Sequence, residues 1–255
     1  MPTGELDPDN PNVVEYGPTG DSTVTVDLSD EDVIDVELFG AAGSDGGSGG
    51  DGGEGGRVIG RDYDVADVDE ITLQIADGQA GYGDGGSGAT SSDGRTGGDG
   101  GGLTVVQRGG DVDLAAHGGG GGYDFGRDEA NGPGGGGSSG GSGATSSDGT
   151  SAGDGLSPLT TDLGGDGGID SDSPAEPGAG HVLTESRFGS TDTFLGEGRS
   201  VHEALARIRF PAETEVEITG TNSPVAVGDE VEVQVDVTNL GPEREITVEL
   251  EADPA

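Results

Sequence analysis

Long glycine-rich tracts are the feature that most restricts how this chain can fold, because residues without side chains cannot build a hydrophobic core. The tracts cover residues 43–56, 77–102 and 118–180, and 57 of the 255 residues are glycine. Short segments in which apolar and polar residues alternate separate the tracts. Flexible linkers are one explanation for such tracts, but three tracts that alternate with patterned segments favour a packed structure.

Polyglycine II helices are the packed structure that such tracts can form. Each is a left-handed helix with three residues per turn, a rise of about 3.1 Å per residue and no internal hydrogen bonds. Without side chains, neighbouring helices can approach until their N–H and C=O groups bond to each other. A bundle of this kind would replace a hydrophobic core with a hydrogen-bonded one.

The segments between the tracts predict β-strands. Their apolar residues recur with the period of two that is typical of a half-buried strand, and Gly109-Gly110 is the expected turn of a hairpin. The predicted fold class is therefore all-β, with β-sandwich-like strands that carry packed polyglycine II helices. The expected strands lie at residues 24–28, 34–38, 58–59, 71–75, 103–106, 112–116 and 206–210.

Changes in composition divide the chain into three parts. Residues 1–21 are rich in proline and are expected to form an N-terminal arm without regular structure. Residues 22–211 would form the glycine-rich domain. Residues 212–255 contain little glycine and show further strand patterns at positions 216–218, 231–237 and 246–250.

The charge of the chain indicates the solvent in which it works. The formal net charge is −41, and all ten basic residues are arginine. Such a chain would repel itself strongly in dilute buffer, but at molar salt the Debye length falls to about 3 Å and the repulsion is screened. Acidity spread evenly over the chain therefore indicates an extreme halophile, with an acidic low-complexity chain as the alternative. Without a basic patch, nucleic acid is not an expected partner.

The sequence contains no convincing catalytic motif, and we expect no enzyme. The three histidines have no metal-ligand spacing, and cysteine is absent. Two matches to G-x-S-x-G, at residues 46–50 and 136–140, lie inside glycine tracts, where such matches arise by chance. No apolar run is long enough to cross a membrane, so membrane insertion is not expected. The first residues do not resemble a secretory signal.

Cation binding is left open by the sequence. Asp-Gly steps recur in the tracts, and carboxylates at glycine turns suit hard cations. The apolar residue that the nonapeptide calcium repeat requires is missing, since Gly53 occupies that position. We therefore predict no cofactor and diffuse cation binding, with specific calcium sites as the alternative and no metal ligand assigned.

Two further features indicate contact surfaces. Tyr82, Tyr123 and Phe125 are aromatic residues within glycine-rich stretches, where they would either contact a partner at loop tips or cap the bundle. Residues 85–94 recur without change as residues 140–149. Two equivalent excursions from one scaffold would explain this repeat, as would slippage in repetitive DNA.

Four motifs in order resemble the glycine-rich domain of anaplastic-lymphoma-kinase-type receptors and of phage tail-tip adhesins. The resemblance covers about residues 22–210, with His117 at a position that is usually glycine. It implies β-strands that carry a polyglycine II bundle used to bind a partner. The motifs are the segments 38–43, 55–58, 73–81 and 114–122.

The tail has a resemblance of its own. Residues 219–241 are similar to the first half of an adhesion-type immunoglobulin-like module of archaeal and bacterial surface proteins. A partial module leaves an open strand edge, so we expect another chain to complete it by strand addition. The expected contact residues are Val231, Val233 and Val235.

The combined prediction is a virion structural protein of a haloarchaeal virus, on the tail or capsid surface, that serves attachment or assembly. Its partners would be other virion proteins and a host surface receptor, and a homo-oligomer is expected. The alternative is a cellular envelope or S-layer-associated adhesin at the surface of a haloarchaeon, against which the unrecognised secretory signal counts.

Overall fold

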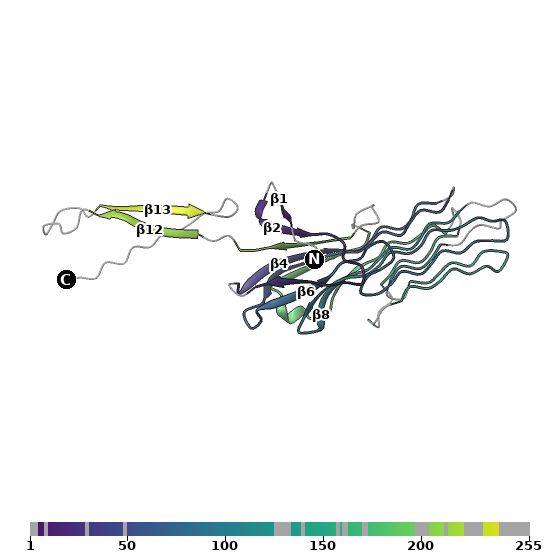
Figure 1. The fold of residues 1–255 in the computed structure, drawn as a ribbon, viewed down its shortest axis with the longest axis horizontal. Helices are drawn as coiled ribbons and strands as arrows, with labels where there is room; N and C mark the ends of the chain where they lie inside the picture. Colours follow the sequence, from purple (N-terminus) through teal and green to yellow (C-terminus); the bar gives the residue numbers. More distant parts are fainter. Residues whose placement is uncertain are drawn as a thin grey trace.

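A computed structural model of the protein has two β-sheets packed face to face, glycine-rich segments that run from one end of them, and a hairpin at the opposite end (Figure 1). All regular structure among the described residues is β-strand except one short 3-10 helix, η1 (Glu185–Arg187). The all-β, sandwich-like fold class is confirmed. The structure describes residues 5–7, 10–28, 31–47, 50–124, 134–138, 141–156, 159, 163–169, 173–196, 204–211, 214–221 and 232–239.

One sheet has six strands, and every neighbouring pair in it is antiparallel. It combines strands from both ends of the glycine-rich region. In spatial order the strands are β1 (Glu5–Asp7), β2 (Asn10–Tyr16), β11 (Leu205–Arg209), β4 (Val33–Phe39), β5 (Arg57–Asp64) and β10 (Ser190–Phe194).

The expected unstructured N-terminal arm is wrong for the described residues before position 17. Strand β2 pairs with β11 along four residues, so that Glu15 lies opposite Arg207. Pro11 precedes this paired stretch, so its missing N–H removes no bond between β2 and β11. The strand that pairs with β2 lies about 190 positions away and leaves no signal in the sequence around β2. The proline content of residues 1–21 therefore did not reveal that this segment forms a strand.

The other sheet has five antiparallel strands and includes the predicted hairpin. Gly109 and Gly110, at its turn, have φ angles of 60° and 94°, as a two-residue turn with two left-handed positions requires. In spatial order the strands are β3 (Val24–Asp27), β6 (Glu70–Gln74), β7 (Thr104–Arg108), β8 (Asp111–Ala116) and β9 (Gly180–Val182).

The two sheets share one hydrophobic core. Alternate residues of each strand point inward, as in β4, where Ile34, Val36 and Leu38 are at most 1% exposed. They pack against inward residues of the facing sheet, such as Leu73 and Leu114. Each such side chain contributes about 1.5–3 kcal/mol to folding through burial, so this small core anchors the sandwich end of the molecule.

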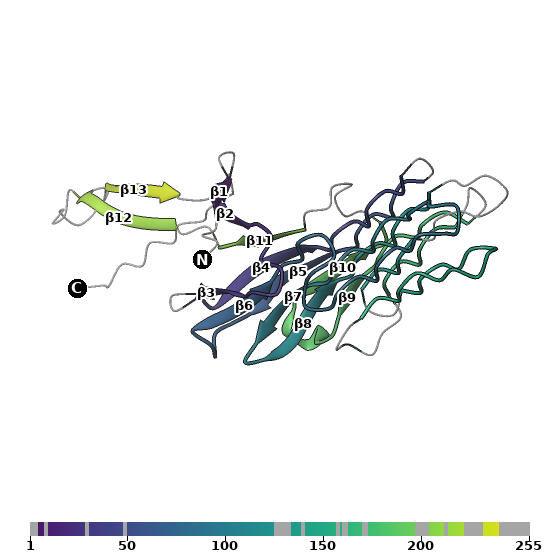
Figure 2. The ribbon, with the colours of Figure 1, turned by 45° about the vertical axis from the view of Figure 1, so that its right-hand side comes forward.

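The tail strands form a separate two-stranded sheet. Strands β12 (Thr214–Thr221) and β13 (Val233–Asn239) pair with each other in register, with Ile218 opposite Val235 and Val216 opposite Val237. In both views the hairpin projects away from the sandwich (Figures 1 and 2). The predicted strand at 246–250 lies outside the described residues.

The glycine-rich segments form the packed bundle that the sequence predicted. Backbone hydrogen bonds join neighbouring segments at every third residue, which is the repeat of polyglycine II. The segment 50–56 shows this against the segment 117–123, with N···O distances of 2.7–2.8 Å. The donating and accepting residues are Gly50 and Tyr123, Gly53 and Gly120, and Gly56 and His117.

Residues 117–123 form the central helix of the bundle. The six N–H groups of residues 117–122 donate in three directions, to the segments 41–44, 135–138 and 176–179. The carbonyl groups of residues 117–123 accept from three others, 50–56, 98–101 and 165–168. Among the described residues, this helix therefore has six bonded neighbours and no unpaired backbone group from His117 to Gly122, which satisfies the backbone without a sheet.

Packing this close excludes side chains from the central helix. A Cβ on Gly118, Gly119, Gly120, Gly121 or Gly122 would lie 1.9–2.1 Å from a backbone carbonyl oxygen of a neighbouring helix. Such a contact is far inside van der Waals distance, and backbone atoms held by several bonds cannot move away cheaply. Glycine is thus required here by contact distance and not by φ.

We predict that Gly120→Ala destabilises the protein by at least about 3 kcal/mol, because its Cβ would lie 2.0 Å from the carbonyl oxygen of Asp166. Gly17→Ala is the matched control, since no atom lies within 4 Å of its Cβ position and its φ is not left-handed. It should change stability by less than about 0.5 kcal/mol. Urea unfolding in molar salt, followed by circular dichroism, measures both. Equal stability of the two variants would contradict the packed bundle.

Candidate functional site

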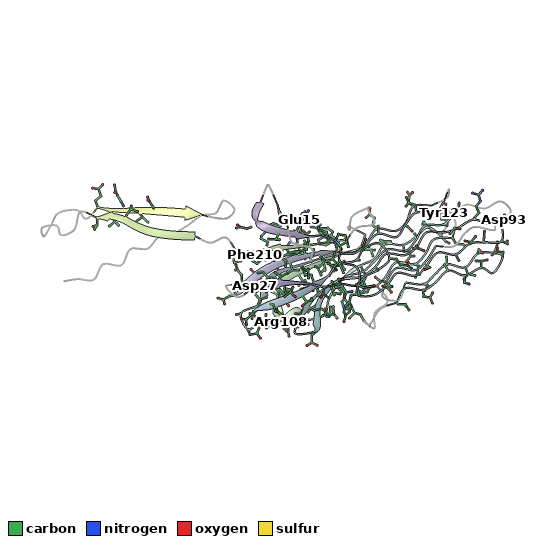
Figure 3. All side chains as sticks on the ribbon, viewed as in Figure 1. Glu15, Asp27, Asp93, Arg108, Tyr123 and Phe210 are labelled. Carbon is green, nitrogen blue, oxygen red and sulfur yellow. The ribbon has the colours of Figure 1, made fainter. Side chains whose placement is uncertain are left out.

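Two loop tips form the end of the bundle that lies far from the sheets. We call residues 89–97 and 144–152 the twin tips. They contain the second half of the repeated sequence, from Ala89 to Gly94 and from Ala144 to Gly149. Asp93 marks the far right end of the molecule in Figure 3, with Tyr123 nearby. This is the part of the glycine-rich region that is best placed to meet another molecule.

The two copies of the repeat have the same structure. In each, a serine N–H bonds to a carbonyl four residues on, and a glycine N–H bonds back to that serine. A side-chain pair, Thr90 with Thr96 or Thr145 with Ser151, closes the base at 2.7 and 2.9 Å. An aspartate then accepts from a glycine N–H at 2.9 and 2.8 Å. The two copies of the repeat therefore form two structurally equivalent loops that extend from the same bundle.

The twin tips contact each other through one carboxylate. Asp148 accepts a hydrogen bond from the backbone N–H of Ser92 at 2.7 Å, and it also accepts from Ser146 and Thr150 in its own tip. These bonds, that from the Ser146 hydroxyl first, hold the pKa of Asp148 below its usual value. The carboxylate thus stays charged and fixes one tip against the other.

The exposed groups of the twin tips are mainly hydroxyls and carboxylates, with the Arg95 guanidinium, whose side chain is 41% exposed, beside them. Ser91 and Ser146 are buried and hold the turns, while the side chains around them face solvent. This surface can exchange hydrogen bonds with polar groups of a partner but offers no large apolar anchor. The exposed residues are Thr90, Ser92, Asp93 and Thr96 in one tip and Thr145, Ser147, Asp148 and Ser151 in the other.

The structure describes two of the three aromatic residues that the sequence suggested as contacts, Tyr82 and Tyr123. Tyr123 is only 8% exposed, and a Cβ on Gly50 would lie 2.4 Å from its ring. This burial favours the alternative that Tyr123 caps the bundle, and its contact with a partner stays a prediction. Tyr82 is half-buried and packs against Leu103, Val105 and Ala115. Phe125 lies outside the described residues.

The predicted tail contacts lie on one strand of the hairpin. Val233 and Val235 on β13 are half-buried, while the polar residues between and beside them, Glu232, Gln234 and Asp236, are exposed. The alternation matches the predicted strand pattern. Val231 lies outside the described residues.

His117 is buried where the sheets meet the bundle. It is 0% exposed, neither ring nitrogen has a hydrogen-bond partner, and its ring centroid lies 5.9 Å from that of His181. Burial, and then the neighbouring His181, lower the pKa of His117 to about 3. The side chain is therefore a neutral filler, inserted where the resemblance implies glycine.

The serine of one G-x-S-x-G match is part of the bundle. Ser138 is 0% exposed, and its hydroxyl oxygen accepts a hydrogen bond from the Gly118 N–H at 3.0 Å. The side chain thus takes the place of a backbone carbonyl in the bundle. Sequence spacing alone does not distinguish this role from that of a nucleophile. Ser48, of the other match, lies outside the described residues.

Carboxylates gather at one open groove. Asp21, Asp77, Asp84 and Asp154 line a groove of about 580 Å³ beside the bundle. Among the described residues, no three acidic or histidine side chains converge closely enough to hold a metal ion. An open acidic groove suits hydrated cations held by charge, and diffuse cation binding stays a prediction.

Comparison with known families places most of the chain in one of them. A family model described as a glycine-rich domain matches residues 18–221. The match extends from before β3 to the end of β12, and so includes the bundle, the five-stranded sheet and the strands β4, β5, β10 and β11 of the six-stranded sheet, but not β1 and β2. No curated protein matches the chain. No helix among the described residues has the length and apolar character needed to span a membrane.

We predict that stability falls by about 2 kcal/mol between pH 6.5 and pH 5 because of His117. The unfolded chain takes up a proton below its ordinary pKa of about 6.5, while burial keeps the folded side chain neutral down to about pH 3. The stability that depends on a neutral His117 is therefore fully present above pH 6.5 and is lost as the pH falls below it. His117→Met should remove this loss and His181→Gln should keep most of it, measured by urea unfolding. A loss unchanged by His117→Met would contradict the assignment.

Proposed function

Since this chain belongs to the glycine-rich domain family, we propose that it is a non-enzymatic structural protein that serves attachment or assembly through its tips. We place it on the tail or capsid surface of a haloarchaeal virus, as a component of the virion. The resemblance to phage tail-tip adhesins and the even acidity of the sequence support this location. The receptor-type resemblance supports the binding role.

The arrangement of the bundle carries the proposal. The core of the sandwich anchors one end, and the bundle extends from it as segments that are cross-linked by backbone hydrogen bonds at every third residue. The twin tips lie at the far end and are fixed to each other by Asp148. A scaffold that holds two equivalent polar loops side by side suits recognition of a partner by rigid loops.

The tail hairpin provides a second connection in the proposal. We assign it to a partial immunoglobulin-like module that docks into the assembly by strand addition. Strands β12 and β13 pair with each other in a sheet of only two strands, and two-stranded sheets are marginal in isolation. Pairing with a strand of another virion protein would supply the missing neighbours.

We expect the chain at fixed stoichiometry in virus particles purified on a salt gradient, measured by mass spectrometry. The washed envelope of the host cells, analysed separately, is the control. A chain found only in the envelope fraction would make it a cellular or S-layer-associated adhesin and would overturn the virion assignment. The test does not depend on which surface binds.

A second prediction concerns the twin tips. Asp93→Ala should weaken binding of the labelled protein to host cells or to virions by at least about fivefold, since it removes an exposed carboxylate at the tip. Asp111→Ala is the matched control, because Asp111 is also exposed but begins β8 at a turn between strands. Equal binding of both variants, at unchanged thermal stability, would contradict recognition by the tips.

A further inference from the structure

The outer face of the six-stranded sheet differs from the rest of the protein in its charge. We use "outer face" for the side of this sheet that points away from the core. Four of the ten arginines lie there, and they line a shallow groove of about 250 Å³: Arg57, Arg61, Arg207 and Arg209. So many arginines on one surface are unexpected in a chain whose net charge is −41.

Carboxylates balance these arginines on the same face. Asp35 and Glu37 lie between them on β4, and Glu15 and Asp192 lie beside them on β2 and β10. The four arginines and these four carboxylates around the groove sum to zero, while Glu5 and Asp64 lie farther out, opposite Glu15 and Val33 in the register of the sheet. The centre of the outer face, around the groove, is thus a neutral area on a protein that is strongly negative as a whole.

Cross-strand contacts fix the charges in alternating order. Arg207 contacts Glu15 at 2.6 Å and Glu37 at 3.4 Å, and Arg57 bonds to the other side of Glu37 at 2.5 Å. The same two guanidinium groups flank the ring of Phe39, each 5.5 Å from its centroid. Side chains held by several contacts lose little entropy when a partner binds.

Apolar side chains lie among the charges. Ile59 is half-buried on β5, between Glu37 and Asp192 in the register of the sheet. Val33, on the same side of β4, is 37% exposed. Arg209 is also exposed and forms no ion pair with a described residue. The face therefore offers both apolar area and a charge that is open to a partner.

We infer that the outer face is the contact surface between two copies of this chain. Two proteins that are both strongly negative repel each other wherever their acidic surfaces meet, and like charges brought together in an interface are costly. A neutral face is where two copies can meet without this repulsion. A two-fold axis brings the same surface of each copy together, and alternating arginine and carboxylate rows can then place opposite charges against each other.

A second copy fits this face better than an anionic ligand does. Arg57, Arg61 and Arg207 are already paired with carboxylates of their own chain, so little positive charge is left for an added anion. A sheet face with a neutral centre and apolar positions is suited to stacking against another sheet about 10 Å away. This inference does not rest on the virion assignment and is tested on the purified full chain.

Sedimentation equilibrium of the full chain at increasing salt tests the inference. We expect a dimer at about 100 µM protein that tightens as the salt rises from about 0.2 M to about 2 M, because salt screens the repulsion of the two negative bodies more than the contacts within the face. A chain that stays monomeric over this whole range would overturn the inference.

Charge reversal locates the dimer surface. Arg209→Glu should weaken dimerisation at least about tenfold at the same salt, since it places a carboxylate in the interface without breaking an internal ion pair. The double variant Ser22→Glu with Thr25→Glu is the matched control, because it also lowers the charge by two at exposed positions outside the six-stranded sheet. This control should change the dissociation constant of the dimer by less than about twofold relative to the unchanged chain.

A milder pair of variants covers the case in which Arg209→Glu does not fold. Arg209→Gln lowers the charge by one and should weaken the dimer about threefold or more. Thr25→Glu is its control, because it lowers the charge by the same amount outside the six-stranded sheet. Circular dichroism checks that each variant is folded. A dimer that responds equally to the Arg209 variants and to their controls would place the contact elsewhere and refute the inference.

Discussion

The hydrogen bonds between polyglycine II helices are the interaction on which the rest of the structure depends. A backbone that forms neither α-helix nor sheet must find partners for every buried N–H and C=O group. Here the central helix, residues 117–123, does so with six neighbours and a repeat of three residues. Each bond contributes about 1 kcal/mol net, but leaving any one unmade inside the bundle costs more than that.

Several other features follow from this bonding. Because helices pack with carbonyl oxygens at the Cβ positions of Gly118 to Gly122, the interior admits almost no side chains. The exceptions are groups that replace backbone partners or fill edges, such as Ser138, which accepts from Gly118, and Tyr123, which covers Gly50. Side chains that could recognise another molecule therefore lie on the outside of the bundle, at its tips and on the sheets.

Charge is distributed to match this division. Exposed carboxylates such as Asp51, Asp99 and Asp154 lie on the outside of the bundle, and the buried His117 stays neutral because burial disfavours its charged form. The outer face of the six-stranded sheet combines four arginines with carboxylates around one groove. Polar tips, a sheet face with paired charges and a separate hairpin thus give one scaffold three distinct surfaces.

The sequence by itself determined the elements whose signal is local. Alternation of apolar residues located β3, β4 and β6, the turn at Gly109-Gly110 followed from its two glycines, and glycine density indicated the bundle. Only the tertiary structure decided which distant segments became neighbours. It placed β2 beside β11, buried Tyr123, and brought Ser92 to Asp148. The physical reason is that these outcomes depend on pairing across tens to hundreds of residues, whereas alternation and turn geometry are fixed by residues next to each other.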